Sequence, residues 1–379
     1  MRTGVSGHPR IQAQFPNFMI TIFTPSFADE ANTNAQNLTV KEVVSRLPPD
    51  RFRVILLGDG TPDPRILARE NTEILPYHRH GNTPRWLASV LRSGIDIYFF
   101  PRFGPLDSMF LFLRRSLRLR VGLVTYIVMA LDEIAVEPTM TRSIREADCV
   151  VGNSLHVSRT VKERFGVNTE TIYDGIDRAL YHPPSQGRQN VSKLTVLYAG
   201  SLQARKRVDV VIREAAKRPS VEFRLTGKGV EEDKLRALVN DLRCRNVTFV
   251  GHLSQPQLAE EMRKADLFLF PSVLEGHPQV LGQAASCGLP AIAMEIYRPD
   301  YVAHDQTGYL VKSEDELSQK LSLLLTDHDL RRKMSVAAAQ HALQFDWDRV
   351  TRDWENVFVQ AAVKRRKKEQ SAEVRQNCK

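Results

Sequence analysis

The residues best suited to chemistry lie in the segment Ala265–Pro290. A short apolar run of strand length, Leu267–Phe270, precedes a loop that carries a carboxylate, Glu275, and then a helix opened by Pro278. Proline suits the first helical position, and we expect the amides that follow to be free and to point back to the loop. These are the amides of Gln279, Val280 and Leu281. Because a helix start with free amides binds phosphate, the segment predicts a phosphate site. Glu275 is placed to accept hydrogen bonds from a sugar attached to that phosphate.

The segment resembles the E-x7-E region of family 4 retaining glycosyltransferases, in the EGFPxVLxE variant, and reads EGHPQVLGQ in this chain. These enzymes use nucleotide sugars and have two Rossmann-like doubly wound domains facing each other across a cleft, the GT-B fold. The resemblance implies that Glu275 and Gly276 lie at the donor sugar, that the amides after Pro278 hold its phosphate, and that the second glutamate position holds the ribose. That position is Gln283, whose neutral amide binds hydroxyls more weakly than a carboxylate. We also expect His277, beside Glu275, to contact the donor sugar.

A basic pair upstream, Arg205 and Lys206, supports this interpretation. Thr195–Ala199 reads as a buried strand, Gly200-Ser201 as a turn, and a helix follows whose apolar residues share one face. The pair therefore lies at the C-terminal end of a strand, where doubly wound sheets bind ligands. The pattern is similar to the G-R-x4-K-G loop of the family, whose cations neutralise the donor pyrophosphate. Lys206 matches the lysine, Ser201 stands at the arginine position, and we expect Arg205 to supply the missing charge. The alternative, a solvated cluster at a helix start, is disfavoured because cations there oppose the helix dipole.

Further landmarks of the family occur in the same order along the chain. The sequence YDGID at 173–177 resembles its NG[VI]D signature, with Asp174 in place of asparagine. The segment Val247–Leu253 resembles a strand and turn that normally face the nucleotide base in this family. The resemblance implies that Gly251, His252 and Leu253 contact that base. The sequence HDQTGYL at 304–310 resembles its HGxTGxL turn. The resemblance covers the chain from about Ala147 to Phe358.

The composition agrees with two α/β domains. A chain of 379 residues with 42% hydrophobic content can bury two cores, and apolar strands alternate with amphipathic helices. We predict an N-terminal acceptor-binding domain over residues 1–185 and a nucleotide-sugar-binding domain over 186–345. A C-terminal helix over 346–379 is expected to pack back on the first domain and to end in a basic tail. The predicted join is the Pro/Gly/Ser/Gln stretch at 181–193.

The cysteines and the N-terminal residues indicate the cellular compartment of the protein. The four cysteines include no closely spaced pair, which argues against a zinc cluster or a disulfide framework and favours a reducing environment. The first residues lack the apolar core of a signal peptide, and no apolar run approaches membrane-spanning length. We therefore expect a cytoplasmic protein.

The first domain offers weaker candidates. At the first turn, where the family has a glycine pair near the donor phosphate, this chain has Asn32-Thr33-Asn34-Ala35. Asn34 tolerates left-handed backbone and is a candidate for that role, with an Asn-rich helix cap as the alternative. The predicted strand Leu123–Met129 lacks the histidine that many relatives place at its end, and Asp132 follows instead. Asp132 either orients an acceptor hydroxyl or is a surface charge.

The net charge of +9 indicates that the protein binds an anionic partner. No recognition helix, RNA-binding aromatic platform or zinc finger is present, so we expect no nucleic acid. On a helical projection of 106–120, the expected core stripe is Leu106, Met109, Phe110, Leu113 and Leu117. The other side mixes three apolar residues with three arginines: Leu111, Phe112, Leu119, Arg114, Arg115 and Arg118. Such a face suits an anionic membrane surface, or extra burial against a neighbouring loop. A second basic run, Lys364–Lys368, is a lipid-attracted arm or a disordered tail.

The sequence thus predicts a cytoplasmic retaining glycosyltransferase, either free or bound peripherally to the inner membrane face. It would transfer a hexose from a nucleoside-diphosphate sugar to a lipid-linked or polysaccharide acceptor. We expect no cofactor and no metal, since the Asp-x-Asp triplets at Asp327 and Asp346 read as helix caps. In this family the leaving diphosphate takes the acceptor proton in a front-face substitution. The alternatives are a phosphorylase or sugar-nucleotide epimerase on the same fold, and a sugar-nucleotide-binding protein without transferase activity. A dehydrogenase is excluded because no G-x-G-x-x-G follows the first strand.

Overall fold

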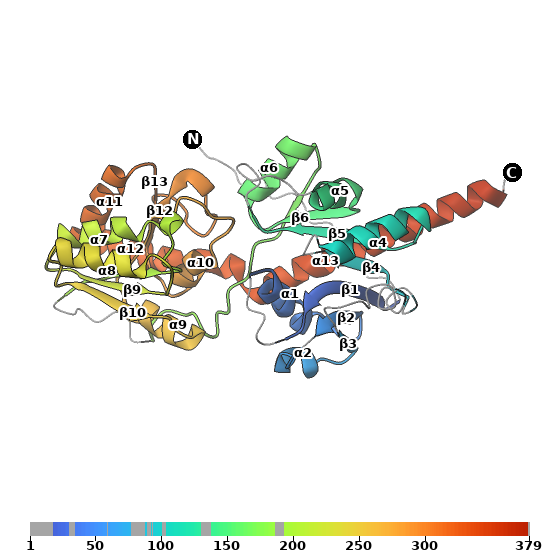
Figure 1. Cartoon of the computed structure of the whole chain (residues 1–379), viewed down its shortest axis with the longest axis horizontal. Coiled ribbons are helices and arrows are strands. Elements are labelled where there is room, and N and C mark those ends of the chain that lie inside the picture. The colour runs from blue at the N-terminus through green and yellow to red at the C-terminus, as the bar shows by residue number, and fades with distance from the viewer. Residues whose placement is uncertain are drawn as a thin grey trace.

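The computed structural model describes residues 18–29, 35–58, 60–76, 88, 92, 94–100, 104–129, 138–185 and 193–377. These residues form two parallel β-sheets with helices against them, one in each half of the molecule (Figure 1). The first sheet has the strand order β3-β2-β1-β4-β5-β6-β7. Its strands are β1 (Ile20–Phe27), β2 (Phe52–Gly58), β3 (Thr72–Pro76), β4 (Ile97–Phe100), β5 (Gly122–Ile127), β6 (Cys149–Gly152) and β7 (Glu170–Thr171).

The second sheet has the strand order β10-β9-β8-β11-β12-β13, and all of its pairings are parallel. Its strands are β8 (Thr195–Ala199), β9 (Glu222–Thr226), β10 (Val247–Gly251), β11 (Leu267–Phe270), β12 (Ala291–Met294) and β13 (Gly308–Val311). Parallel sheets are covered on both faces, so their strands consist of continuous apolar runs. All four residues of β11 are buried, as expected from that pattern.

The helices connect these strands in the alternation that the sequence predicts. In the first half they are α1 (Ala35–Arg46), α2 (Pro64–Leu67), α4 (Pro105–Ser116), α5 (Pro138–Glu146) and α6 (Leu155–Phe165). In the second half they are α7 (Val208–Ala216), α8 (Glu232–Asp241), α9 (Gln255–Lys264), α10 (Gln279–Ser286), α11 (Glu314–Thr326) and α12 (His328–His341). The last helix, α13 (Trp347–Asn377), packs against β5 and α1 of the first half. Short 3₁₀ turns are η1 (Ala204–Lys206), η2 (Glu295–Tyr297) and η3 (Ala342–Phe345).

The last helix returns to the first sheet. Figure 1 shows α13 leaving the second half of the molecule and running along the first half to the C-terminus. Trp354 is fully buried there, with its ring centroid 5.0 Å from those of Phe99 and Tyr126. Where the chain crosses between the halves, the Ile176 amide donates to the Phe345 carbonyl at 2.7 Å. The two crossing segments therefore lie side by side.

Each sheet has a point where the strand order reverses. In the second sheet the chain runs outward from β8 through β9 to β10 and then returns to place β11 on the other side of β8. Ligands bind in doubly wound sheets at such switch points, outside the carboxyl ends of the strands. The loops after β8 and β11 are therefore brought together where a ligand is expected.

Helix α4 differs from the sequence-based prediction. Leu111, assigned to the outer face, is buried, while Leu117, assigned to the core stripe, is 61% exposed. Arg114 is also structural: Nε donates to the Val121 carbonyl, and a terminal nitrogen lies 2.7 Å from an Asp148 carboxylate oxygen. The prediction was wrong at these positions because α4 ends at Ser116, so Leu117 no longer follows the helical repeat, and because Leu111 lies in the same buried cluster as Phe110. Leu119, also assigned to the outer face, is partly buried against that cluster. Phe112, at 62% exposure, remains outward as predicted.

Candidate functional site

The two loops at the switch point contact each other directly. After β8 the chain forms the 3₁₀ turn η1, and after β11 it forms a loop that leads into α10. The amide of Val273 donates to the Arg205 carbonyl at 3.0 Å, and the hydroxyl of Ser272 donates to the same oxygen at 3.3 Å. These bonds hold the predicted phosphate loop and the predicted sugar loop as one unit.

Glu275 lies at the centre of this unit. Its Oε1 accepts from Arg205 at 3.1 Å, and also from the Lys206 ammonium and the Ser272 hydroxyl. The side chains of Lys206 and Glu275 are each 10% exposed, whereas that of Arg205 is 41% exposed. The structure thus brings together Arg205, Lys206 and Glu275, which the sequence analysis assigned to one site from motifs about 70 residues apart. Ser272 is a member that the sequence analysis missed.

Burial shapes the electrostatics of this cluster. It lowers the pKa of Lys206, and the attraction of Glu275 opposes that shift. The ammonium also lies 5.1 Å from the centroid of the Phe270 ring, a distance at which a cation is attracted to an aromatic face. Lys206 is therefore a desolvated cation, and such a charge interacts strongly with an anion that replaces the surrounding water.

The start of α10 differs in detail from the prediction. Pro278 has extended backbone and is the N-cap, so the helix begins at Gln279. The amide of Leu281 donates to the Pro278 carbonyl at 3.0 Å and is not free, which corrects the prediction for this residue. The amides of Gln279 and Val280 are in the first turn, where helix geometry supplies no acceptor. The candidate phosphate-binding amides are therefore these two.

Gly276 lies against the first domain. A Cβ atom at this position would be 2.3 Å from the Val128 carbonyl oxygen, which follows β5. No side chain fits there, so glycine is required by this close approach. A second contact between the halves runs from the Leu155 amide to Asp300 Oδ2, at 3.1 Å. Burial raises the pKa of Asp300. The close approach of Gly276 to Val128 places the sugar loop at the carboxyl end of β5, where acceptor-binding residues were predicted.

His277 does not occupy the predicted position. Its side chain is fully buried, and its ring stacks on that of Tyr301 with the centroids 3.9 Å apart. The imidazole points away from solvent into an aromatic cluster at the crossing between the halves, which also includes Tyr173 and Phe345. Contact of this side chain with a donor sugar is incompatible with that burial, and we correct the prediction accordingly.

The predicted nucleotide-binding residues lie at the ends of neighbouring strands. Gly200 and Ser201 follow β8, and the Gly200 amide donates to the Thr226 carbonyl at 3.1 Å. Gly251 ends β10 with a φ of 83°, and is followed by His252, which is exposed, and Leu253, which is partly buried. These positions share one edge of the second sheet with the Glu275 cluster.

Gln283, at the predicted ribose position, has a partner that the sequence did not reveal. Its Nε2 donates to Gln255 Oε1 at 3.2 Å, and the hydroxyl of Tyr181 donates to the same oxygen. Gln255 and Gln283 are 28 residues apart on different helices, so no local pattern indicates the contact.

Two sequence-based candidates lie outside the described residues: Asn34 and Asp132.

The two Asp-x-Asp triplets are at helix starts, as predicted. Asp327 accepts from the Leu330 amide at 2.9 Å and caps α12, and Asp346 accepts from the Asp348 amide at 2.9 Å. Within the described part of the chain, no group of three or more His, Cys, Asp or Glu side chains is placed to hold a metal ion. In that same part, no helix has the length and apolar character needed to cross a bilayer.

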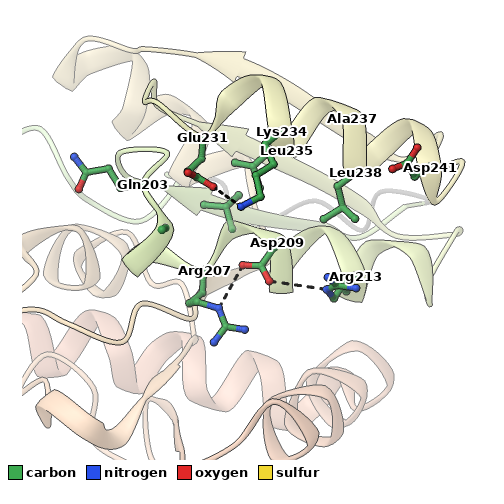
Figure 2. Close-up of a pocket in the computed structure, with 12 residues that line it drawn as sticks. Gln203, Arg207, Asp209, Arg213, Glu231, Lys234, Leu235, Ala237, Leu238 and Asp241 are labelled. Atoms are coloured by element: carbon green, nitrogen blue, oxygen red, sulfur yellow. Dashed lines mark hydrogen bonds and ion pairs between the residues drawn. The ribbon is translucent and has the colours of Figure 1, made fainter.

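A pocket of 510 Å³ lies between α7 and α8 (Figure 2). Its charged residues are largely paired with one another: Asp209 lies 3.4 Å from Arg207 and 3.9 Å from Arg213, and Lys234 lies 3.1 Å from Glu231. The residues that line it do not include Arg205, Lys206 or Glu275. The pocket adjoins the Glu275 cluster through Gln203, whose Oε1 accepts from Arg205 Nε at 3.2 Å, but it does not contain the cluster.

Comparisons with known proteins agree with the geometry of the second domain. Residues 184–341 match the model of the family described as glycosyl transferases group 1. A D-inositol 3-phosphate glycosyltransferase of Mycobacterium bovis (strain BCG / Pasteur 1173P2) is 31% identical over 231 residues, which cover 55% of this chain and 48% of that protein. The chain thus spans about half the length of the curated relatives it matches.

Solved structures match almost the whole chain. HepE of Anabaena in complex with UDP has a TM-score of 0.74 and 19% identity, covering 89% of this chain and 99% of its own. Sucrose-phosphate synthase of Thermosynechococcus elongatus has a TM-score of 0.73 and 19% identity, covering 90% and 99%. At these identities the likeness shows the fold, which is the GT-B arrangement of two Rossmann-like domains. In sequence, the second domain of this chain is similar to the group 1 glycosyl transferases.

Proposed function

We propose that this chain is a retaining glycosyltransferase that moves a hexose from a nucleoside-diphosphate sugar to a lipid-linked or polysaccharide acceptor, without a metal. The observation that carries the proposal is the cluster of Glu275 with Arg205 and Lys206, at the switch point of the second sheet and facing the first domain. The relatives support the donor class: the HepE structures contain UDP or UDP-glucose, and the curated relative is named a glycosyltransferase.

The cluster can exchange partners when a donor binds. In the structure the single negative charge of Glu275 is shared between Lys206 and Arg205. A donor diphosphate competes for these cations, and its binding frees the carboxylate of Glu275 to accept hydrogen bonds from the sugar hydroxyls. The amides of Gln279 and Val280 are available to the same phosphate groups. One cluster thereby binds both parts of the donor.

The same groups suit the chemical step. As the bond between the anomeric carbon and the diphosphate oxygen breaks, negative charge builds on the diphosphate, and Arg205 and Lys206 stabilise it. The acceptor oxygen forms its bond to the same face of the sugar, and its proton passes to the departing diphosphate. No protein base is needed in this scheme. The two side-chain cations supply the positive charge that the leaving group requires, which is the basis for proposing that transfer proceeds without a metal.

A donor screen tests this function. Thermal shift with UDP-, GDP- and ADP-sugars should identify one base, since a ligand that binds the native state raises its apparent stability. With that donor and a glycan acceptor, we expect release of nucleoside diphosphate and an NMR spectrum of the product with the anomeric configuration of the donor, unchanged by EDTA. Inverted configuration or loss of activity in EDTA would refute the mechanism. Turnover that depends on inorganic phosphate, epimerised donor without nucleotide release, or binding without turnover would support the respective alternatives.

We further propose that the enzyme acts at the cytoplasmic face of a membrane, through the end of α4. The exposed residues there include two apolar and two basic side chains: Phe112, Leu117, Arg115 and Arg118. The backbone brings a second basic run close to them, because the Lys364 ammonium donates to the Asp148 carbonyl while Arg114 pairs with the Asp148 carboxylate. The run Lys364–Lys368 thus begins beside α4, although about 250 residues separate the two in sequence. Exposed apolar groups among cations favour an anionic bilayer surface.

We expect the protein to sediment with anionic liposomes at low salt, to bind neutral liposomes poorly, and to dissociate as salt rises, because each basic side chain contributes about 1 kcal/mol that salt screens. The combined change Phe112→Ser, Arg115→Gln and Arg118→Gln should reduce sedimentation at least tenfold without lowering the melting temperature. The matched control changes Val336→Ser, Arg332→Gln and Lys333→Gln, exposed residues of α12 with the same loss of charge. Equal losses in both triple variants would show that net charge, and not this face, determines binding.

A further inference from the structure

A buried carboxylate and a buried imidazole lie next to each other where the two domains meet. Asp174, which is 4% exposed, belongs to the segment that crosses between them. Its Oδ1 accepts from the Thr39 hydroxyl at 2.8 Å and from the Tyr126 hydroxyl at 2.7 Å. Its Oδ2 accepts from Asn153 Nδ2 at 3.1 Å, and His277 Nδ1 lies 3.9 Å from the same oxygen. Three donors of the first domain thus hold both oxygens of the carboxylate, and a histidine of the donor loop faces Oδ2.

His277 has no hydrogen-bond partner for either ring nitrogen among the described residues. The ring is enclosed by the aromatic side chains of Tyr301, Tyr173 and Phe345, which offer faces and edges to pack against. Buried polar atoms are normally paired, and each exception calls for an explanation. Asp174 Oδ2 is an acceptor close to Nδ1, and a shift of about 1 Å would bring the pair to hydrogen-bond length.

Both residues depart from the sequence patterns of the family at the same point in space. Asp174 stands where the NG[VI]D signature has asparagine, and His277 stands where the EGFP sequence has phenylalanine. An asparagine at 174 offers one acceptor oxygen and one NH₂ group, whereas a carboxylate accepts on both oxygens. A phenyl ring at 277 fills the same aromatic enclosure without a polar atom. Asparagine with phenylalanine is a compatible pair when the Asn153 amide turns its oxygen towards residue 174, and aspartate with histidine is another.

The position of His277 connects this pair to the donor site. His277 is two residues from Glu275 and directly follows Gly276, which has no room for a Cβ atom against the Val128 carbonyl. A bond from His277 to Asp174 therefore joins the loop that carries Glu275 to α1, β5 and the residue after β6, through Thr39, Tyr126 and Asn153.

We propose that Asp174 and His277 are coupled positioning residues. Nδ1 of His277 carries a proton and donates a hydrogen bond to Asp174 Oδ2, so that the first domain sets the placement of Glu275. This inference rests on the proposed function, because placement matters only if Glu275 binds the donor sugar. It assigns neither residue a contact with the substrate.

The test is a double-mutant cycle with Asp174→Asn, His277→Phe and the double variant. Each single change should lower kcat/KM for the donor at least tenfold: Asp174→Asn turns an NH₂ group towards His277, and His277→Phe leaves the carboxylate without its fourth donor. The double variant, which has the family's pair, should return to within about threefold of the parent. Losses in the double variant that equal the sum of the two single losses in free energy would overturn the coupling, since the effects of independent sites add. Thr39→Val removes a different donor to Asp174 and should not be rescued by His277→Phe.

Two further measurements separate positioning from folding. Affinity for the nucleoside diphosphate should agree within about threefold across the cycle, while affinity for the sugar nucleotide follows kcat/KM; equal loss of both would indicate general damage to the domain. If His277→Phe fails to fold, His277→Gln, which keeps a donor, replaces it and should retain more activity than the Asp174→Asn variant. In ¹⁵N-labelled histidine NMR, His277 should show a proton on Nδ1, and an unprotonated Nδ1 would refute the proposal. If the parent binds the donor but transfers nothing, the proposed function fails, while the affinity ratios and the NMR spectrum still decide the coupling.

Discussion

Replacing Glu275 by alanine should lower the rate of transfer at least about 100-fold, the usual effect of removing a preorganised group at the reacting centre. The structure adds a second expectation. Because Glu275 forms ion pairs with both Lys206 and Arg205, its removal leaves both cations without a carboxylate, and the nucleoside diphosphate should bind as tightly as before or more tightly. Calorimetric titration with the nucleoside diphosphate and with the intact donor, beside initial rates, separates the two effects.

Two controls sharpen the Glu275 experiment. Glu275→Gln keeps the shape and loses the charge, so it should release the cations as alanine does while retaining part of the sugar contact. Asp329→Ala removes a carboxylate from α12 whose side chain is 93% exposed, and should change neither rate nor affinity. If Glu275→Ala weakened the nucleoside diphosphate and the donor equally, Glu275 would act on the phosphate loop and not on the sugar.

Replacing Lys206 by alanine should lower kcat/KM at least tenfold while the fold remains intact. A charge-assisted contact to the leaving group in a water-poor site is worth about 2 to 4 kcal/mol of transition-state stabilisation. The partly exposed Arg205 is screened by solvent, so Arg205→Ala should have a smaller effect. Lys264→Ala, at a side chain 61% exposed on α9, is the matched control. Kinetics that are unchanged in Lys206→Ala would remove this residue from the diphosphate site.

The pH dependence gives an independent check on Lys206. Burial lowers the pKa of Lys206 in the folded protein. Only the protonated ammonium attracts the diphosphate, so activity should fall as pH rises, at a pH below the ordinary lysine value of about 10.4. In Lys206→Arg the guanidinium stays charged, and this alkaline decline should move to higher pH. A decline at the same pH in both proteins would assign the titration to another group.

The sequence alone determined the features that depend on neighbouring residues. The buried runs of β8 and β11 are continuous in sequence, and the prolines, glycines and polar residues that end them set the loops in which Lys206 and Glu275 lie. The alternation of strands and helices predicted two α/β domains, the resemblance of the motifs implied the GT-B fold, and the structural matches confirm that fold. The parallel order of a doubly wound sheet then predicted that both loops lie at one edge.

Tertiary structure alone decided which side chains share an environment. The pairing of Lys206 with Glu275 joins residues 69 positions apart, and the burial of His277 depends on Tyr301, Phe345 and Asp174, each contributed by a different segment. Helix α4 shows the same limit, because periodicity indicates that a helix has an apolar face but not where the helix ends or how many neighbours cover it. Hydrophobic burial is non-directional, so a local pattern specifies how much apolar surface a helix must cover, while the partners follow from the packing of the whole chain.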